Sequence, residues 1–195
     1  MKKIKLIIYH PYSDIGGADN SLNRLLSRLN TDYFSITFVS LNKSFLRHQL
    51  KRKVEFVNLD SSRALFSIFK LRTLVKKYQL SKKYSKIIVF SNQHYGNILS
   101  FLSNLFLNNI KKIFIDRNHL DELKFDRNIF KKVKNNLIRL LIKISYKHAD
   151  IVIGISKKLS TDLSKFCNVK VKTIYSPAYD KSIFQKAKKN IKINN

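Results

Sequence analysis

The sequence predicts an α/β protein with a doubly wound, mainly parallel, Rossmann-like sheet of about seven strands. The first observation behind this prediction is the opening segment, residues 3–29, in which a strand, a polar loop and a helix follow one another. The second is that strand-like and helix-like patterns alternate almost to the end of the chain. Strands separated by helices form parallel sheets with right-handed crossovers, so both observations lead to the same fold class.

The opening segment is the clearest unit. Residues 3–9 are apolar and rich in β-branched side chains, which is typical of a fully buried strand. The loop behind it ends in Gly16-Gly17, and four leucines then recur at helical spacing: Leu22, Leu25, Leu26 and Leu29. In sheets that begin this way, ligands bind outside the carboxyl ends of the strands.

The later elements follow the same alternation. Each expected strand is a short run of β-branched and aromatic residues bounded by polar ones. We expect these strands at residues 34–40, 53–59, 86–91, 110–115, 149–155 and 169–175. Apolar residues at helical spacing predict helices at residues 63–79, 96–107, 121–148 and 157–166, with a basic, helical link at 44–53.

The length and composition predict one compact domain. A chain of 195 residues has little room for a second domain, and its 44% hydrophobic content is enough for a real core. We expect residues 1–184 to form this domain, and residues 185–195 to be a basic tail or the start of an interdomain link.

The compartment is predicted from what the sequence lacks. A single cysteine, Cys167, excludes an internal disulfide and a cysteine-cluster zinc site, which fits a reducing compartment. The first apolar run is broken at His10-Pro11, too early for a secretory signal, and no uncharged apolar run is long enough to span a bilayer. We therefore expect a cytoplasmic protein, and peripheral attachment to the inner face of the cell membrane stays open.

The formal net charge of +27 is extreme for a soluble enzyme domain. A field of this sign favours anionic partners such as nucleic acid, acidic lipid or phosphorylated substrates. The alternative is a coding bias toward lysine, isoleucine and asparagine that carries no functional meaning.

Polar residues collect at the ends of the predicted strands. Three of the five histidines, His10, His94 and His119, fall just after strands. Comparable positions are occupied by Asp14, Asn92, Gln93, Arg117, Asn118, Ser156 and Ser176. In a parallel sheet these residues converge on one rim, where a doubly wound fold binds ligands. The competing explanation is that loops are polar in any protein.

Several common site motifs are absent. Gly16-Gly17 lets the backbone approach a ligand closely, but the segment is not the dinucleotide fingerprint, and no Gly-Lys-Ser/Thr phosphate loop occurs. No His-Glu-x-x-His, paired cysteines or Gly-x-Ser-x-Gly is present. The sequence therefore predicts no metal site and no tightly bound cofactor.

The long helical segment at residues 127–147 contains basic residues and no acid. The spacing predicts a core-facing stripe that consists of Ile129, Val133, Leu137, Leu140 and Ile144. Ile138 and Ile142 fall outside this stripe, among the lysines. A basic surface with interspersed apolar residues suits contact with anionic lipid, and an ordinary solvated face is the alternative.

Three segments resemble a known enzyme family. They are GGADNSLNRLLSRL after the first strand, IDRNHL at the end of the fifth, and YKHADIVIGISKKLSTDL with the following KTIYSPAYDKSIF. In this order they resemble the N-terminal, acceptor-side domain of GT-B glycosyltransferases of family 4. Asp19 stands where the family commonly has glutamate, and Ser176-Pro177 replaces its closing Asn-Pro.

The resemblance implies a function in glycosyl transfer. The donor would be a nucleotide sugar, and the acceptor a lipid-linked or polysaccharide precursor. Gly16 and Gly17 would line the cleft near the donor phosphates, and His119 would be the catalytic residue. The resemblance also implies substrate contacts from His10, Asp14, His94, Arg117, Asn118 and Ser156.

Enzymes of this family are about twice as long, because a second Rossmann-like domain holds the sugar nucleotide. No segment here resembles that domain, so the chain would be the acceptor-binding half. It would then be a fragment, one half of a split enzyme completed by a donor-domain subunit, or an inactive remnant. A basic nucleic-acid-binding protein is the competing hypothesis, but no nucleic-acid-binding signature occurs in the sequence.

Overall fold

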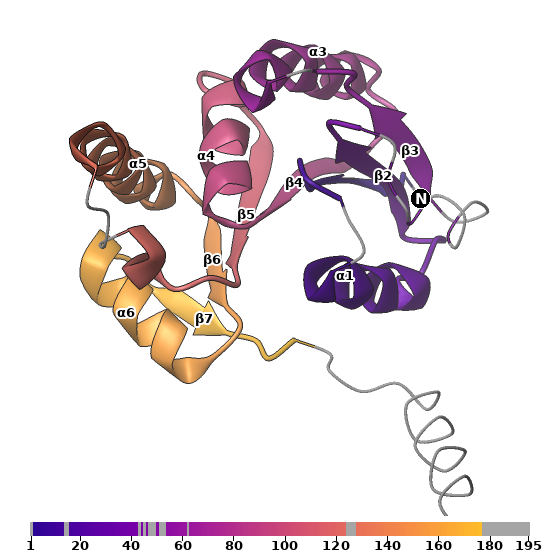
Figure 1. Cartoon of the computed structure of the whole chain (residues 1–195). Helices are drawn as coiled ribbons and strands as arrows, with labels where there is room; N and C mark the ends of the chain where they lie inside the picture. The colour runs from indigo at the N-terminus through magenta and orange to yellow at the C-terminus, as the bar shows by residue number, and fades with distance from the viewer. Residues whose placement is uncertain are drawn as a thin grey trace, which may run out of the picture.

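Seven strands form one fully parallel sheet, in the order β3-β2-β1-β4-β5-β6-β7 (Figure 1). The structure is a computed structural model that describes residues 2–13, 16–42, 44, 46, 50, 54–61, 63–123 and 128–176. The predicted Rossmann-like fold with about seven strands is confirmed. The strands are β1 (Ile4–Tyr9), β2 (Phe34–Ser40), β3 (Glu55–Asn58), β4 (Lys86–Asn92), β5 (Ile110–Asp116), β6 (Ile151–Gly154) and β7 (Val171–Thr173).

Helices cover both faces of this sheet. On one face, α3, α4, α5 and α6 follow one another as neighbours, and α1 packs on the other face (Figure 1). Right-handed crossovers require this arrangement, because the chain moves one way from β1 to β3 and the opposite way from β4 to β7. The helices are α1 (Gly17–Arg28), α3 (Ser67–Leu80), α4 (His94–Ser103), α5 (Ile129–Lys147) and α6 (Lys157–Cys167), with short 3₁₀ turns at Ala64–Phe66 and Leu120–Leu123.

The buried apolar side chains form three clusters. One lies between the β1, β2 and β4 strands and α3, and a second joins α1 to the other face of β1 and β2. The third packs α4, α5 and α6 on β5 and β6. Strands buried on both faces explain why the sequence shows continuous apolar runs rather than alternation.

The observed elements differ from the predicted ones mainly at their ends. The predicted helix at 121–148 is a 3₁₀ turn followed by α5, and residues 124–127 between them lie outside the described residues. Most of the expected link at 44–53 and the whole segment 177–195 also lie outside them, including the predicted domain boundary at 184. None of the described helices is long and apolar enough to cross a membrane.

The predicted core-facing stripe of α5 is wrong. Ile129, Val133 and Leu137 are 70%, 65% and 55% exposed, and Leu140 and Ile144 are exposed too. Ile142, which was expected to lie outside the stripe, is fully buried. The helix carries apolar residues on two sides, and the side that packs inward is the one that also brings Ser145 and Tyr146 into the core.

Gly154, at the end of β6, packs closely against Ser160 of α6. A Cβ atom on Gly154 would lie 2.5 Å from Ser160 Oγ, 3.0 Å from Ser160 N and 3.1 Å from Ser160 Cα. Because the last two are backbone atoms of α6, Gly154→Ala must push the helix off the sheet. We expect a loss of about 1–3 kcal/mol in the free energy of unfolding, measured by denaturant titration.

The matched control is Gly17→Ala, where an added Cβ meets nothing within 4 Å. This variant should change the free energy of unfolding by less than about 0.5 kcal/mol. Equal losses in the two variants would contradict the packing of α6 on β6.

Candidate functional site: a crevice at the switch point of the sheet

A crevice opens at the carboxyl ends of β1 and β4, where the direction of the strand order reverses. Its volume is about 520 Å³. The residues that line it come from the loops after five of the parallel strands. They include His10 and Tyr12 after β1, Gln93 after β4, Arg117 and Asn118 after β5, Ile155 after β6 and Ser176 after β7.

The start of α1 forms one wall of the crevice. Gly16 is the N-cap of this helix and, as a glycine, has no side chain of its own to accept from the first-turn amides. The space around the Cα atom of Gly17 is open, and both glycines line the crevice. The first-turn amides of a helix carry partial positive charge and suit an oxygen-rich or anionic ligand.

Arg117 joins three elements at the centre of the site. Its Nε donates to Asn92 Oδ1 at 2.9 Å, Nη1 to Ser176 Oγ at 2.8 Å and Nη2 to Ser21 Oγ at 3.2 Å. Burial lowers the pKa of the guanidinium, and the charge of Asp19 opposes that shift. These contacts hold the half-buried guanidinium in one orientation on the wall of the crevice.

The contact with Arg117 also fixes the proton on His10. A guanidinium cannot accept a hydrogen bond, so the Asn92 amide must turn its oxygen toward Arg117. The Asn92 Nδ2 group then faces His10 Nδ1 at 3.1 Å and donates to it. Neutral His10 therefore carries its proton on Nε2, which lies 3.6 Å from Asp19 Oδ1.

Asp19 is a buried carboxylate in the first turn of α1. It is 3% exposed and accepts a hydrogen bond from Ser13 Oγ at 2.8 Å. A carboxylate in the first turn is stabilised by the helix dipole, and here it also ties the start of α1 to the loop after β1. The family-like position of Asp19 was noted from the sequence, but its proximity to His10 depends on the fold.

Gln93 has a strained backbone beside the crevice. Its φ of 69° and ψ of 153° are rarely adopted by residues other than glycine. Gln93 N donates to Ile115 O at 2.9 Å, which holds the turn between β4 and α4 against β5. Strain of this kind occurs preferentially at functional sites, and no residue pattern in the sequence marks it.

Five of the predicted site residues line the crevice together: His10, Gly16, Gly17, Arg117 and Asn118. Ser156, by contrast, is the N-cap of α6 and accepts a hydrogen bond from Leu159 N at 3.2 Å. Asp14 lies outside the described residues. Tyr12 and Ser21 are additional residues at or beside the site, and no pattern in the sequence marks either of them.

His94 lies inside the protein rather than on the crevice wall. Its Nδ1 is 2.6 Å from Asp116 Oδ2, and the fully buried Tyr146 donates its hydroxyl proton to the same oxygen. Burial by itself lowers the pKa of His94, but the charge and hydrogen bond of Asp116 outweigh it, and the pKa lies above its ordinary value. This cluster ties α4 and α5 to the end of β5, so a substrate contact from His94 stays an untested prediction.

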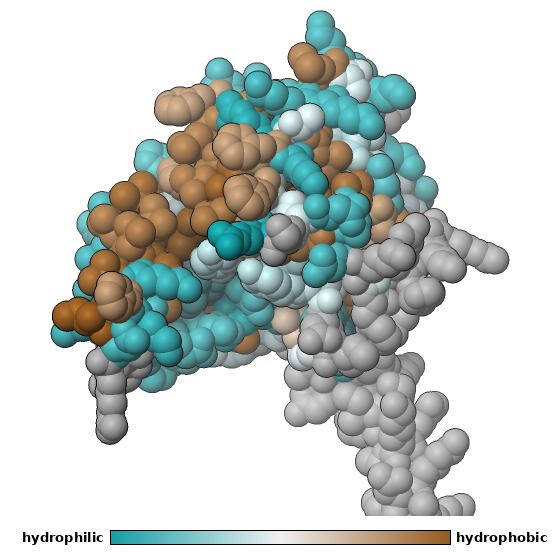
Figure 2. All heavy atoms as spheres, turned by 45° about the horizontal axis from the view of Figure 1, so that its top comes forward, coloured by the Kyte–Doolittle hydropathy of each residue, from teal (hydrophilic) through white to brown (hydrophobic). Residues whose placement is uncertain are grey.

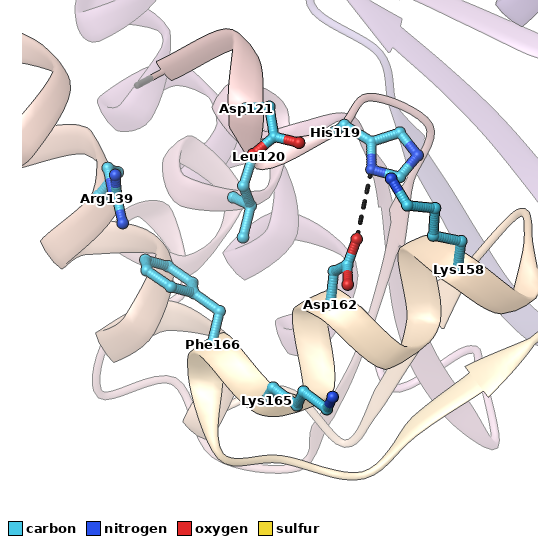
Figure 3. A pocket seen from close by; sticks show the side chains of 8 residues that line it. All are labelled: His119, Leu120, Asp121, Arg139, Lys158, Asp162, Lys165 and Phe166. Carbon is cyan, nitrogen blue, oxygen red and sulfur yellow. Dashed lines mark ion pairs between the residues drawn. The ribbon is translucent and has the colours of Figure 1, made fainter. Parts of the chain in front are cut away.

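His119 faces a second pocket, between the 3₁₀ turn at Leu120–Leu123, α5 and α6 (Figure 3). Its Nδ1 lies 3.6 Å from Asp162 Oδ2, and its side chain is 38% exposed. Because Asn118 lines the crevice, His119 stands on the boundary between the two hollows. Across the residues that the structure describes, no three His, Cys, Asp or Glu side chains form a group able to hold a metal ion.

Similar folds occur among solved protein structures. No protein-family model matches the chain, and no curated protein matches it. Among solved structures, the Anabaena protein HepE, in complex with UDP and glucose, aligns with a TM-score of 0.58 at 14% identity, over 95% of this chain and 50% of that one. The lipopolysaccharide outer core galactosyltransferase WaaB aligns with a TM-score of 0.60 at 11% identity, over 90% of this chain and 46% of that one.

A third alignment, with MurG from Acinetobacter baumannii, has a TM-score of 0.50 at 12% identity and covers 89% of this chain and 45% of that one. This chain has the fold of a single GT-B glycosyltransferase domain. It spans about half the length of these three GT-B chains.

The hydrogen bonds of the crevice predict the tautomer of His10. At a pH where the imidazole is neutral, nitrogen-15 NMR should find the proton on Nε2, because Asn92 donates to Nδ1. In Asn92→Asp a carboxylate accepts at that position, so the proton should move to Nδ1.

Asn118→Asp is the matched control, because it introduces the same charge into the same crevice without contacting His10. It should leave the tautomer unchanged. A wild-type His10 with its proton on Nδ1 would contradict the orientation of Asn92.

Proposed function

We propose that this chain is the acceptor-side, N-terminal-type half of a family 4 glycosyltransferase. In this proposal a nucleotide sugar is the donor, a lipid-linked or polysaccharide precursor is the acceptor, and a separate donor domain or subunit completes the cleft. The observation that carries the proposal is the preformed crevice at the switch point, in a fold that aligns with about half of HepE and WaaB. UDP and glucose, the ligands in the HepE structure, are of the chemical class that such a crevice suits.

The chemistry of the crevice supports an oxygen-rich ligand. The amides at the start of α1, the guanidinium of Arg117 and the Nε2–H of His10 are all hydrogen-bond donors. Arg117 already donates to Asn92, Ser176 and Ser21, and His10 Nε2 is buried toward Asp19, so the first-turn amides of α1 are the donors most open to a phosphate or a sugar hydroxyl. Asp19, which is partnered inside the protein, adds an acceptor that can bind a sugar hydroxyl.

His119 is the proposed catalytic residue. It follows β5 at the border of the crevice, and its partly exposed imidazole next to Asp162 can give or take a proton from a ligand there. We expect a ligand that fills the crevice to extend past Asn118 toward this side chain.

We also propose that the chain binds the inner face of the cell membrane through α5. The exposed apolar residues of this helix lie on one side of it, and Figure 2 shows brown, apolar side chains gathered over the side of the molecule where α5 lies. Lys132, Arg139 and Lys143 border this stripe, since they are spaced seven and four residues apart. An apolar stripe with a basic border suits an anionic bilayer.

Because the proposal requires a separate donor domain or subunit to complete the cleft, we expect that the isolated chain does not transfer sugar. Transfer requires a donor held against an acceptor in a closed, water-poor cleft, and this crevice supplies one wall. We expect donor binding by calorimetry to be too weak to measure, because little of a nucleotide sugar would be buried. Tight binding or measurable transfer without a partner would show that the crevice is itself a complete active site.

A chimera tests the positive side of the proposal. Joining this chain to the second half of the HepE chain should create transfer or donor hydrolysis with UDP-glucose. His119→Asn should then lower the rate about a hundredfold or more. His148→Asn, an exposed histidine at the end of α5, is the matched control and should leave the rate unchanged.

Flotation with liposomes tests the membrane proposal. Leu137→Glu with Leu140→Glu should weaken binding to anionic vesicles more than about tenfold, because both side chains would leave the acyl region. Tyr33→Glu with Leu80→Glu changes two equally exposed apolar residues away from α5 and is the control. Equal losses in both pairs, or equal binding to neutral vesicles, would contradict a role for α5.

A further inference from the structure

The hollow beside His119 is a second, separate pocket, which we call the α5–α6 pocket. Its volume is about 520 Å³, equal to that of the crevice. Figure 3 shows Arg139 entering it from α5, and Lys158 and Lys165 from α6. The proposed transfer reaction assigns no role to these three cations.

The cations of this pocket form no ion pair with a carboxylate of the described residues. Among the described residues, no carboxylate oxygen lies within 4.0 Å of Arg139, Lys158 or Lys165, although Asp162 lies on the pocket wall. Asp162 instead faces His119, and Asp121 has an interaction of its own. Three like charges that share one concave surface repel one another, and an anion between them would relieve that repulsion.

Phe166 holds part of this arrangement in place. The guanidinium of Arg139 lies 5.1 Å from the centre of its ring, and Lys143 Nζ lies 4.8 Å from it. These cation–π contacts keep both head groups at the border between α5 and α6 without neutralising their charge. The pocket therefore has an aromatic wall and a lining of three cations and two carboxylates, Asp121 and Asp162.

The position of the pocket indicates where its ligand comes from. On one side its lining begins at His119, the residue next in the chain to Asn118 of the crevice. At the other side Arg139 belongs to the basic border of the exposed stripe on α5. A group bound in the pocket thus lies between the surface proposed to contact the bilayer and the crevice proposed to hold the reacting sugar.

We propose that the α5–α6 pocket binds the phosphate of a lipid whose apolar chain lies along the exposed stripe of α5. A terminal phosphate carries up to two negative charges on three acceptor oxygens, so it can accept hydrogen bonds from several cations at once. The inference rests on the proposed function, because it names the acceptor of that reaction as a phospholipid-like molecule. Binding to the pocket nevertheless requires no donor domain and no transfer, so it can be measured independently.

The experiment is a titration of the full chain at physiological salt, followed by nitrogen-15 NMR. Inorganic pyrophosphate should give saturable shifts of the amides of α6 around Lys158 and Lys165. Arg139→Gln, Lys158→Gln and Lys165→Gln together should lower the affinity at these amides more than about tenfold, since each removes a charged hydrogen-bond donor. Lys134→Gln, Lys170→Gln and Lys172→Gln together remove the same charge outside the pocket and should have little effect.

A second arm separates a lipid phosphate from a free one. Vesicles of phosphatidylcholine that contain phosphatidic acid should bind more tightly than vesicles with phosphatidylserine at the same surface charge. The pocket variant should remove that difference, and Leu137→Glu with Leu140→Glu should weaken vesicle binding while leaving pyrophosphate binding intact.

Two results would overturn the proposal. One is equal loss of pyrophosphate affinity in the pocket variant and the control variant, which would show that net charge alone accounts for the binding. The other is the absence of any preference for phosphatidic acid, which would exclude a terminal lipid phosphomonoester, the form of lipid phosphate that this proposal requires, as the ligand. Either result would leave the chimera test of glycosyl transfer unaffected.

Discussion

The parallel pairing of β1 with β4 is the constraint on which the rest of the structure depends. These strands lie side by side in the middle of the sheet, with Ile4 opposite Lys86 and Tyr9 opposite Ser91, although about eighty residues separate them in the sequence. The chain leaves β1 in one direction and returns past it to continue from β4 in the other. Because α1 and α4 then pack on opposite faces, neither covers the carboxyl ends of the two central strands, and the crevice remains open there.

A small set of polar contacts turns that opening into a defined site. Arg117 reaches from β5 to Asn92 at the end of β4, to Ser21 in α1 and to Ser176 behind β7. Because its oxygen faces Arg117, the Asn92 amide donates from Nδ2 to His10 Nδ1 at the end of β1. Each contact joins segments that are distant in sequence, so the geometry of the donors in the crevice is a property of the whole sheet. The strained turn at Gln93 is held by the same packing.

The α5 helix shows how a buried polar group decides which side of a helix faces the core. Tyr146 is fully buried and bonds to Asp116 and to Asn97, whose amide donates to the tyrosine oxygen at 2.8 Å. Rotating the helix to bury the longer apolar stripe would bring Tyr146 out and take its hydroxyl away from the Asp116 carboxylate, which is 0% exposed and would keep its contact with His94. The longer stripe is therefore exposed beside the cations of α5 and α6, and this combination led to the membrane and phosphate proposals.

The sequence by itself determined the fold class, the approximate strands and the loops that carry His10, Gly16-Gly17, Arg117 and Asn118, because local apolar periodicity and chain alternation fix these. Only the tertiary structure decided that His94 pairs with Asp116 inside the core, that His119 faces a second pocket, and that α5 exposes its longer apolar stripe. The physical reason is the same in each case. Hydrophobic spacing is compatible with more than one local arrangement, and hydrogen bonds and ion pairs between distant segments determine which of them forms.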